Sequence, residues 1–138
     1  MAKAEKSGTG KSGKAKPAGQ LTTRTLAMPG DTNPAGDIFG GWVVAEMDKA
    51  GAICAGQSAK CRVVTVAIDA MSFIEPVFVG DVLSIYTNVT RTGRTSITTQ
   101  IEAWVIRNRV GEEVKVTEGT FTFVAVDAKR KPKPLKKG

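Results

Sequence analysis

The chain of 138 residues contains no histidine. This absence excludes catalysis by Ser-His-Asp or Cys-His groups, and it excludes metal sites built on imidazole. Only two cysteines occur, Cys54 and Cys61, which give neither a disulfide framework nor a four-ligand zinc site. We therefore expect no metal site, and general-base or nucleophilic chemistry would rest on a positioned carboxylate.

Long apolar runs are also absent. No stretch reaches the ~18 residues of a membrane-spanning helix, and the N-terminal residues lack the apolar core of a secretion signal. We therefore expect no membrane partner and a cytoplasmic location.

The net charge of +7 belongs to the ends of the chain. Residues 1–20 carry a net charge of +4 and residues 127–138 carry +5, whereas residues 21–126 carry −2. Basic ends of this kind bind polyanions or simply keep a protein soluble, and neither end interleaves aromatic residues for base stacking. We expect disordered basic tails at 1–19 and 128–138, one domain at 20–127, and no specific nucleic-acid partner.

The patterned block between the tails predicts one helix and several strands. Turn-forming residues fill 29–36, and a helix is expected at about 38–58 with Asp37 as its N-cap. Alternating or valine-rich segments predict strands at Gln20–Met28, Cys61–Asp69, Val82–Thr90, Arg94–Arg107 and Glu113–Val126. This order predicts an α+β fold, with a mainly antiparallel sheet of five or six strands on one long helix.

Small residues interrupt the predicted helix repeatedly. Each glycine inside a helix costs about 1 kcal/mol relative to alanine. A helix that tolerates this cost lets other backbone approach closely, so we expect the sheet to curl tightly around it. The small residues are Gly40, Gly41, Ala45, Ala50, Gly51, Ala52, Ala55 and Gly56.

Asp48 is the first candidate for chemistry. Its neighbours three, four and seven positions away on a helix are all apolar or small. A carboxylate at the centre of such a face needs a partner or a function, and a buried structural carboxylate remains the alternative. Glu46 differs, because Lys49 lies three residues further on and makes an exposed ion pair possible.

Asn33 and the glycines at the helix start form the second candidate group. Asn33-Pro34 is also ordinary turn chemistry. Gly40 and Gly41 leave the free N–H groups and the positive end of the helix dipole unobstructed, where a carbonyl oxygen can bind as it becomes an oxyanion. Close packing explains these two glycines equally well.

Nine segments in order resemble YciA-like acyl-CoA thioesterases of the hot-dog fold. The resemblance covers about residues 21–127 and leaves out both tails. It is carried by Thr25–Pro29, Asp31–Asn33, Gly36–Trp42, Met47–Asp48, Arg62–Val66, Pro76–Val77, Val79–Val82, Glu102–Val105 and Phe123–Asp127.

The resemblance implies a sheet wrapped around one central helix and a homodimer whose sheets join edge to edge, assembled further into a trimer of dimers. It also implies active sites between two subunits, where an Asn from one works with a helix acid from the other. These positions match Asn33 and Asp48. Asp48 would act as general base or as nucleophile, with the carbonyl held by backbone near Gly41 and with no cofactor beyond the coenzyme A of substrate and product. Pro34 follows Asn33 where relatives often have small residues.

Binding of coenzyme A calls for cations and hydrogen-bonding groups. The hydroxyl of Thr65 is expected in the central valine-rich strand, lining an acyl or pantetheine channel, although its role in strand formation explains it as well. For the charged candidates, a solvated surface position is the alternative. The full set of substrate-binding candidates is Phe39, Lys60, Arg62, Thr65, Arg91, Arg94 and Ser96.

Two other functions remain open from the sequence. A hydratase acting on acyl-CoA would share the fold, but such chemistry usually uses an Asp-His pair, and histidine is absent. The second is a non-catalytic module that binds acyl-CoA, or binds polyanions through its tails; retention of Asn33 and Asp48 argues against it.

Overall fold

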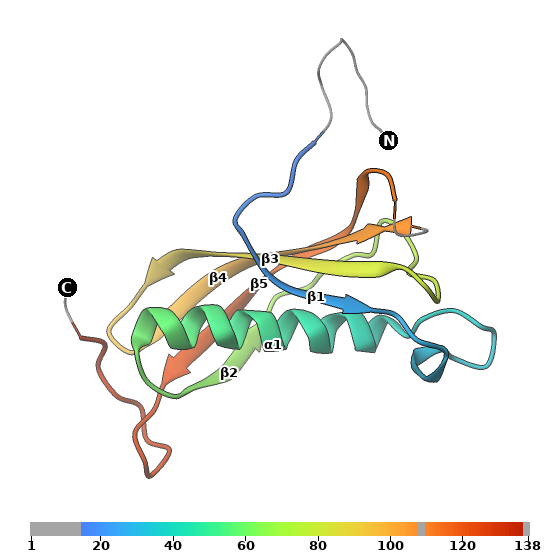
Figure 1. The fold of residues 1–138 in the computed structure, drawn as a ribbon. Coiled ribbons are helices and arrows are strands. Elements are labelled where there is room, and N and C mark those ends of the chain that lie inside the picture. Colours follow the sequence, from blue (N-terminus) through green and yellow to red (C-terminus); the bar gives the residue numbers. More distant parts are fainter. Residues whose placement is uncertain (1–14, 108–109, 137–138) are drawn as a thin grey trace.

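Five antiparallel strands bend around one long helix in the computed structural model, which describes residues 15–107 and 110–136 (Figure 1). The helix is α1 (Gly40–Ala59), and the strand order in the sheet is β1-β3-β4-β5-β2. This arrangement confirms the α+β hot-dog prediction, with five strands among the described residues. The strands are β1 (Gln20–Leu26), β2 (Val63–Ile68), β3 (Val82–Thr92), β4 (Ser96–Ile106) and β5 (Glu113–Ala125).

The core lies between α1 and the inner face of the sheet. Alternation along each strand places every second side chain toward the helix, and the helix contributes Val43, Met47 and Ala50 to the same core. Gly51 explains how the two layers come so close. A β-carbon there would lie 2.6 Å from Cδ1 of Ile101 and 2.8 Å from Cζ of Phe123. The expectation of close approach is therefore confirmed at Gly51.

The helix begins two residues later than its sequence pattern predicts. Asp37 is not the N-cap: Phe39 takes that position, and it makes no capping hydrogen bond through its side chain. The cause is a competing set of backbone bonds. Ile38 forms a bridge with Thr32 and donates from its N–H to the carbonyl of Val77 at 3.3 Å, so the chain at Ile38 is extended.

Strand β2 is the valine-rich segment that the sequence placed at the centre of the sheet, and this placement is wrong. It lies at an edge, bonded only to β5 among the described strands, with Val66 and Ile68 55% and 43% exposed. Valine-rich composition reports a preference for strand conformation, not a position in the sheet. An edge strand with exposed apolar side chains is suited to pairing with another chain.

Residues 128–136 follow a defined path, unlike the free tail that their composition suggests. The N–H of Lys133 donates to the carbonyl of Ala125 at 2.8 Å, and the N–H of Leu135 donates to the carbonyl of Arg94 at 2.8 Å. Leu135 packs against the core. The expected N-terminal tail lies mostly outside the described residues.

Candidate active site

Asp48 lies two turns into α1 and receives a hydrogen bond from the sheet. The hydroxyl of Thr65, in β2, donates to its Oδ1 at 2.7 Å. Within residues 15–107 and 110–136, Oδ2 has no hydrogen-bond partner. The side chain is partly exposed in the single chain rather than buried, because the buried stripe of α1 runs through Val43 and Met47 instead. Asp48 is thus held at one oxygen, and its other oxygen has no hydrogen bond among the described residues.

Glu46 is buried, whereas the sequence predicts an exposed position for it. It is 9% exposed, and its Oε1 accepts a hydrogen bond from Thr25 of β1 at 3.1 Å. The pairing with Lys49 is confirmed, at 3.1 Å between Nζ and Oε2. Both carboxylate oxygens are therefore occupied, which makes Glu46 a link between α1 and β1.

Asn33 sits in a tight turn ahead of α1. Its Oδ1 accepts hydrogen bonds from the backbone N–H groups of Ala35 and Asp37 at 2.9 and 3.1 Å. Gly36 closes the turn with φ +93°, a left-handed conformation that favours glycine. With Oδ1 saturated, the donor end of the amide, Nδ2, is the part of Asn33 left for a ligand.

One chain does not bring Asn33 and Asp48 together. The eight residues from Gly40 to Asp48 rise about 12 Å along the helix axis, and the loop that holds Asn33 lies beyond the N-terminal end of α1 (Figure 1). A hydrogen bond spans less than a third of that length. Each chain therefore carries the two groups at separate places.

The N-terminus of α1 offers free backbone donors. Among the described residues, neither the N–H of Gly40 nor that of Gly41 has a bonding partner. A β-carbon at Gly41 would meet no other atom within 4 Å, while one at Gly40 would touch the ring of Phe73 at 3.5 Å. The positive end of the helix dipole adds to these donors, so the first turn is chemically suited to stabilise an oxyanion. Phe39, 52% exposed, borders it.

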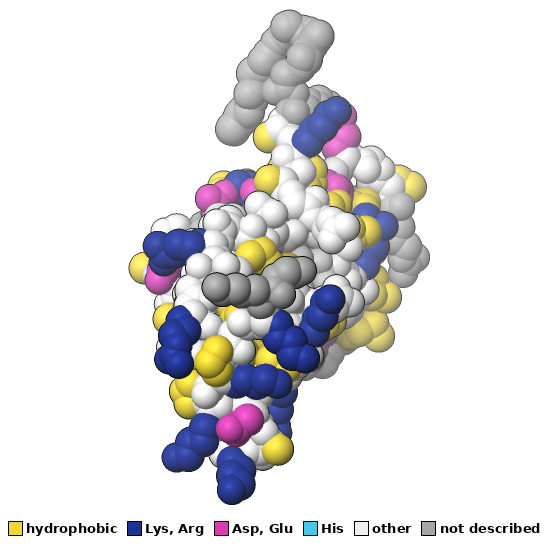
Figure 2. Space-filling model, turned by 90° about the vertical axis from the view of Figure 1, so that its left-hand side faces the viewer, with side chains coloured by type: hydrophobic (Ala, Val, Ile, Leu, Met, Phe, Trp, Pro, Cys, Tyr) yellow, Lys and Arg dark blue, Asp and Glu magenta, His cyan; other side chains and the backbone are white. Residues whose placement is uncertain are grey.

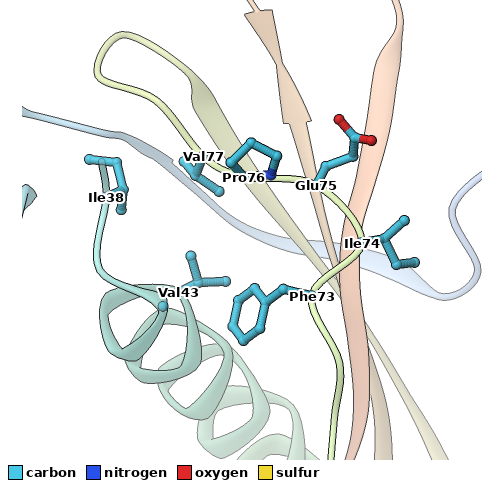
Figure 3. Close-up of a pocket in the computed structure, with 8 residues that line it drawn as sticks. Ile38, Val43, Phe73, Ile74, Glu75, Pro76 and Val77 are labelled. Carbon is cyan, nitrogen blue, oxygen red and sulfur yellow. The ribbon is translucent and has the colours of Figure 1, made fainter. Parts of the chain in front are cut away.

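A cavity of about 310 Å³ opens beside this helix end (Figure 3). The ring of Phe73 faces α1 next to Val43, and Glu75 points away from the helix. The sequence patterns do not identify loop residues 73–77 as site residues, although a run as apolar as Phe73-Ile74 in a loop is a usable signal. The lining consists of Ile38, Gly40, Val43, Phe73, Ile74, Glu75, Pro76 and Val77.

One of the remaining candidates lies beside Asp48, and the others lie at the C-terminal end of α1. Thr65 contacts Asp48, as described. Arg94 lies at the far end, where it lines a second cavity with Ser58 and Lys136. Arg62 is tied to that end by the bond from the N–H of Val126 to its carbonyl, at 2.9 Å. Lys60 directly follows α1, and Arg91 and Ser96 lie on either side of the β3–β4 turn, so all three lie at the same end. They do not surround Asp48.

Groups of three or more potential metal ligands do not occur among residues 15–107 and 110–136. In the same part of the chain, no helix combines the length and the apolar character needed to cross a membrane.

Comparison with known proteins identifies the family of this chain. The pattern that defines the thioesterase superfamily matches residues 35–112, so the chain is a thioesterase-superfamily protein. It is 50% identical over 122 residues to the acyl-CoA thioester hydrolase YciA of Salmonella typhimurium, covering 86% of this chain and 92% of that protein. The chain belongs to the YciA family of acyl-CoA thioester hydrolases.

Solved structures give the same result. The hexameric thioesterase y2039 of Yersinia pestis superposes with a TM-score of 0.85 at 51% identity, covering 89% of this chain and all of that one. HI0827, described as a hexameric broad-specificity acyl-coenzyme A thioesterase, superposes with a TM-score of 0.84 at 46% identity, covering 89% and 85%.

Proposed function

We propose that this protein hydrolyses acyl-CoA thioesters to free coenzyme A and a carboxylic acid, with Asp48 of one subunit and Asn33 of its partner acting on one thioester. Membership of the YciA family supports the activity. The observation that carries the residue assignment is the hydrogen bond between Thr65 and Asp48. It orients the carboxylate, and the second oxygen has no hydrogen bond among the described residues.

In this mechanism the thioester carbonyl lies at the start of the α1 helix of the subunit that supplies Asn33. Asp48 comes from the other subunit, because Gly40 and Asp48 of one chain lie about 12 Å apart along the helix axis. The free N–H groups of Gly40 and Gly41 stabilise the negative charge that develops on its oxygen. Asp48 removes a proton from water, the water oxygen bonds to the carbonyl carbon, and the C–S bond breaks with its electron pair on sulfur. The departing thiolate is coenzyme A. Nδ2 of Asn33 donates to the water or to the carbonyl and orients it.

Asp48 has a second possible role, as the nucleophile. Its oxygen would then attack the carbonyl directly, the thiolate would leave, and water would hydrolyse the resulting mixed anhydride. Rapid-quench kinetics separate the two routes. A burst of thiol ahead of the acid identifies the anhydride, whereas simultaneous release of thiol and acid identifies the general base.

The separation of Asn33 and Asp48 within one chain supports a site shared between subunits. We propose a homodimer joined at the exposed edge of β2 and assembled as a trimer of dimers, since y2039 and HI0827 are described as hexameric. Sedimentation of the full chain measures the assembly. The reaction uses no cofactor beyond the coenzyme A of the substrate. We place the enzyme in the cytoplasm, where its two free cysteines stay reduced.

The decisive experiment is a thiol-release assay across short, branched, aromatic and long acyl-CoAs. We expect turnover by the wild type and a loss of at least about 100-fold in kcat for Asp48→Asn. Asp69→Asn, the same change at an exposed carboxylate after β2, is the control and keeps wild-type activity. An Asp48→Asn protein that assembles normally and remains fully active would refute the assignment.

A further inference from the structure

One arginine side chain holds much of the connection that leads into β3. Arg107 directly follows β4, and its Nη2 donates to the carbonyl of Pro76 at 2.5 Å, while its Nε donates to Oδ2 of Asp81 at 3.4 Å. Its Nη1 lies 3.9 Å from Oε1 of Glu75, and its guanidinium carbon lies 4.7 Å from the centre of the Phe78 ring. A planar guanidinium makes such contacts in several directions at once, which a lysine ammonium group does not reproduce.

The connection between β2 and β3 is described in full, at residues 69–81, and contains neither helix nor strand. Its second half, residues 75–81, is held by Arg107 and by a second side chain, that of Asp81. Asp81 is 3% exposed, and its Oδ2 accepts from the N–H of Phe78 at 2.9 Å as well as from Arg107. A buried carboxylate that loses its cation is left with an uncompensated charge. The two side chains therefore fix segment 75–81 together.

Segment 75–81 is bonded in turn to the residues just before α1. The carbonyl of Val77 accepts a hydrogen bond from the N–H of Ile38 at 3.3 Å. Val77 and Ile38 are 4% and 7% exposed, and both belong to the core. Ile38 precedes Gly40, the first residue of the helix, by two positions. The position of segment 75–81 therefore affects the first turn of α1, where the N–H groups of Gly40 and Gly41 are the proposed oxyanion donors.

The same segment forms a wall of the cavity of about 310 Å³ beside the helix start (Figure 3). Glu75, Pro76 and Val77 line this cavity, and Val43 lines it from α1. In the proposed mechanism the thioester carbonyl lies at the start of α1, so the group attached to the carbonyl carbon begins next to the cavity. A difference of one methylene in such a fit changes the preference between two substrates by roughly 10- to 200-fold. The place of the wall therefore influences which acyl groups are hydrolysed fastest.

Arg107 is set apart from the cations that could attract an anionic substrate. Lys and Arg side chains gather around the C-terminal end of α1 (Figure 2), whereas Arg107 contacts Pro76, which lines the cavity at the N-terminal end. Two carboxylates offset its charge, those of Asp81 and Glu75. Because protein acceptors occupy its guanidinium, Arg107 is suited to supporting a neighbouring segment and not to binding a phosphate.

We infer that Arg107 is a positioning residue for the hydrolysis of acyl-CoA, an inference that rests on the proposed function. Arg107 fixes segment 75–81, and this segment fixes both the oxyanion donors at the start of α1 and one wall of the adjoining cavity. Arg107 acts through Pro76 and Val77 and contacts no reacting atom. Its loss should therefore change the rate and the acyl preference together, because both depend on the same segment.

The test measures kcat and the ratio of kcat/KM between a short and a branched acyl-CoA. In Arg107→Gln we expect kcat to fall about 10- to 100-fold, and we expect the ratio to change at least about threefold. The ratio does not depend on the concentration of folded enzyme, so partial unfolding cannot imitate the change. Arg107→Lys keeps a charge beside Asp81 and should unfold at a urea concentration closer to that of the wild type. It should still show the altered ratio, since an ammonium group cannot hold Pro76 and Asp81 together.

The control is Arg24→Gln, which removes an arginine of β1 that lies 3.7 Å from its ion-pair partner Glu113 and keeps the wild-type ratio. Hydrogen exchange measured by mass spectrometry gives a reading independent of turnover. We expect residues 37–39 and 75–81 to exchange at least about tenfold faster in Arg107→Gln than in the wild type or the control.

Each outcome decides one proposal. Faster exchange in Arg107→Gln, with no hydrolysis by the wild type, refutes the proposed function and leaves the link between Arg107 and the helix start intact. When the wild type is active, an unchanged kcat or an unchanged ratio in the variant overturns the inference, whatever the exchange rates are. A lower kcat with unchanged exchange overturns it as well, since Arg107 would then act on the substrate directly.

Discussion

The hydroxyl of Thr65 in edge strand β2 donates a 2.7 Å hydrogen bond to Oδ1 of Asp48 on α1. It joins the part of the sheet suited to pairing with another subunit to the carboxylate proposed to do the chemistry. In the proposed dimer, pairing at β2 and orientation of Asp48 are therefore linked through one side chain.

Replacing Thr65 with valine tests this link, because valine keeps the shape of threonine and removes the hydroxyl. A hydrogen bond to a charged group contributes roughly 1.5–3 kcal/mol, so we expect kcat to fall about 10- to 100-fold with little change in KM. Thr65→Ser retains the donor and should recover most of the activity. If Thr65→Val has the same kcat as the wild type, the side chain of Thr65 contributes only to strand formation.

Mixed dimers test whether Asn33 and Asp48 act across subunits. Asn33→Ala and Asp48→Ala chains, each inactive alone, are co-expressed with different tags. If each site takes the two groups from different chains, a mixed dimer contains one intact site. Random assembly then gives about a quarter of wild-type activity. If both groups acted from one chain, no combination would restore activity, and the mixture would stay as inactive as its parents.

Much of this arrangement follows from local sequence pattern, and the rest depends on which segments become neighbours. Helical spacing placed Asp48 on α1 and turn chemistry placed Asn33 ahead of it, and both placements are correct. The same patterns carry no information on strand order. Valine-rich composition therefore predicts a central position for β2, whereas β2 lies at the edge of the sheet. Residue spacing on α1 likewise left Glu46 exposed, because contact with β1 is a tertiary event.

At the C-terminal end, amino-acid composition predicts the structure less well than residue patterns do elsewhere in the chain. Lysine and proline content predicts an unstructured tail after Asp127. The segment is nevertheless held by backbone bonds to Ala125 and Arg94, and backbone donors are present whatever the side chains are.

Replacing either of two glycines in α1 with alanine should change stability, in opposite directions at the two positions. A β-carbon at Gly51 would lie 2.6 Å from Ile101, so Gly51→Ala should reduce the free energy of unfolding by about 1–3 kcal/mol through overpacking. Gly41 faces open space, and Gly41→Ala should raise stability by up to about 1 kcal/mol through helix propensity. Urea unfolding of both variants measures the difference. Equal effects at both positions would show that Gly51 is not required for the close approach of the sheet.

The ionisation of Tyr86 should reduce the stability of the folded protein at high pH. Burial, followed by the hydrogen bonds from its hydroxyl to Glu113 at 2.7 and 2.8 Å, raises the pKa of Tyr86 above its ordinary value of 10.0. A raised pKa in the folded state means that the folded protein holds this proton more tightly than the unfolded chain does. The resulting stability is fully present below pH 10 and is lost as the pH rises through the folded-state pKa.

Because Tyr86 is the single tyrosine of the chain, ultraviolet absorbance of tyrosinate reports its ionisation without overlap from other tyrosines. We expect the midpoint in the folded protein to lie above that in urea. Tyr86→Phe should remove this contribution to the alkaline loss of stability, while Glu113→Gln should lower the midpoint, since the amide removes the nearby negative charge. A folded midpoint equal to the unfolded one would show that the contact with Glu113 and partial burial do not favour the neutral phenol.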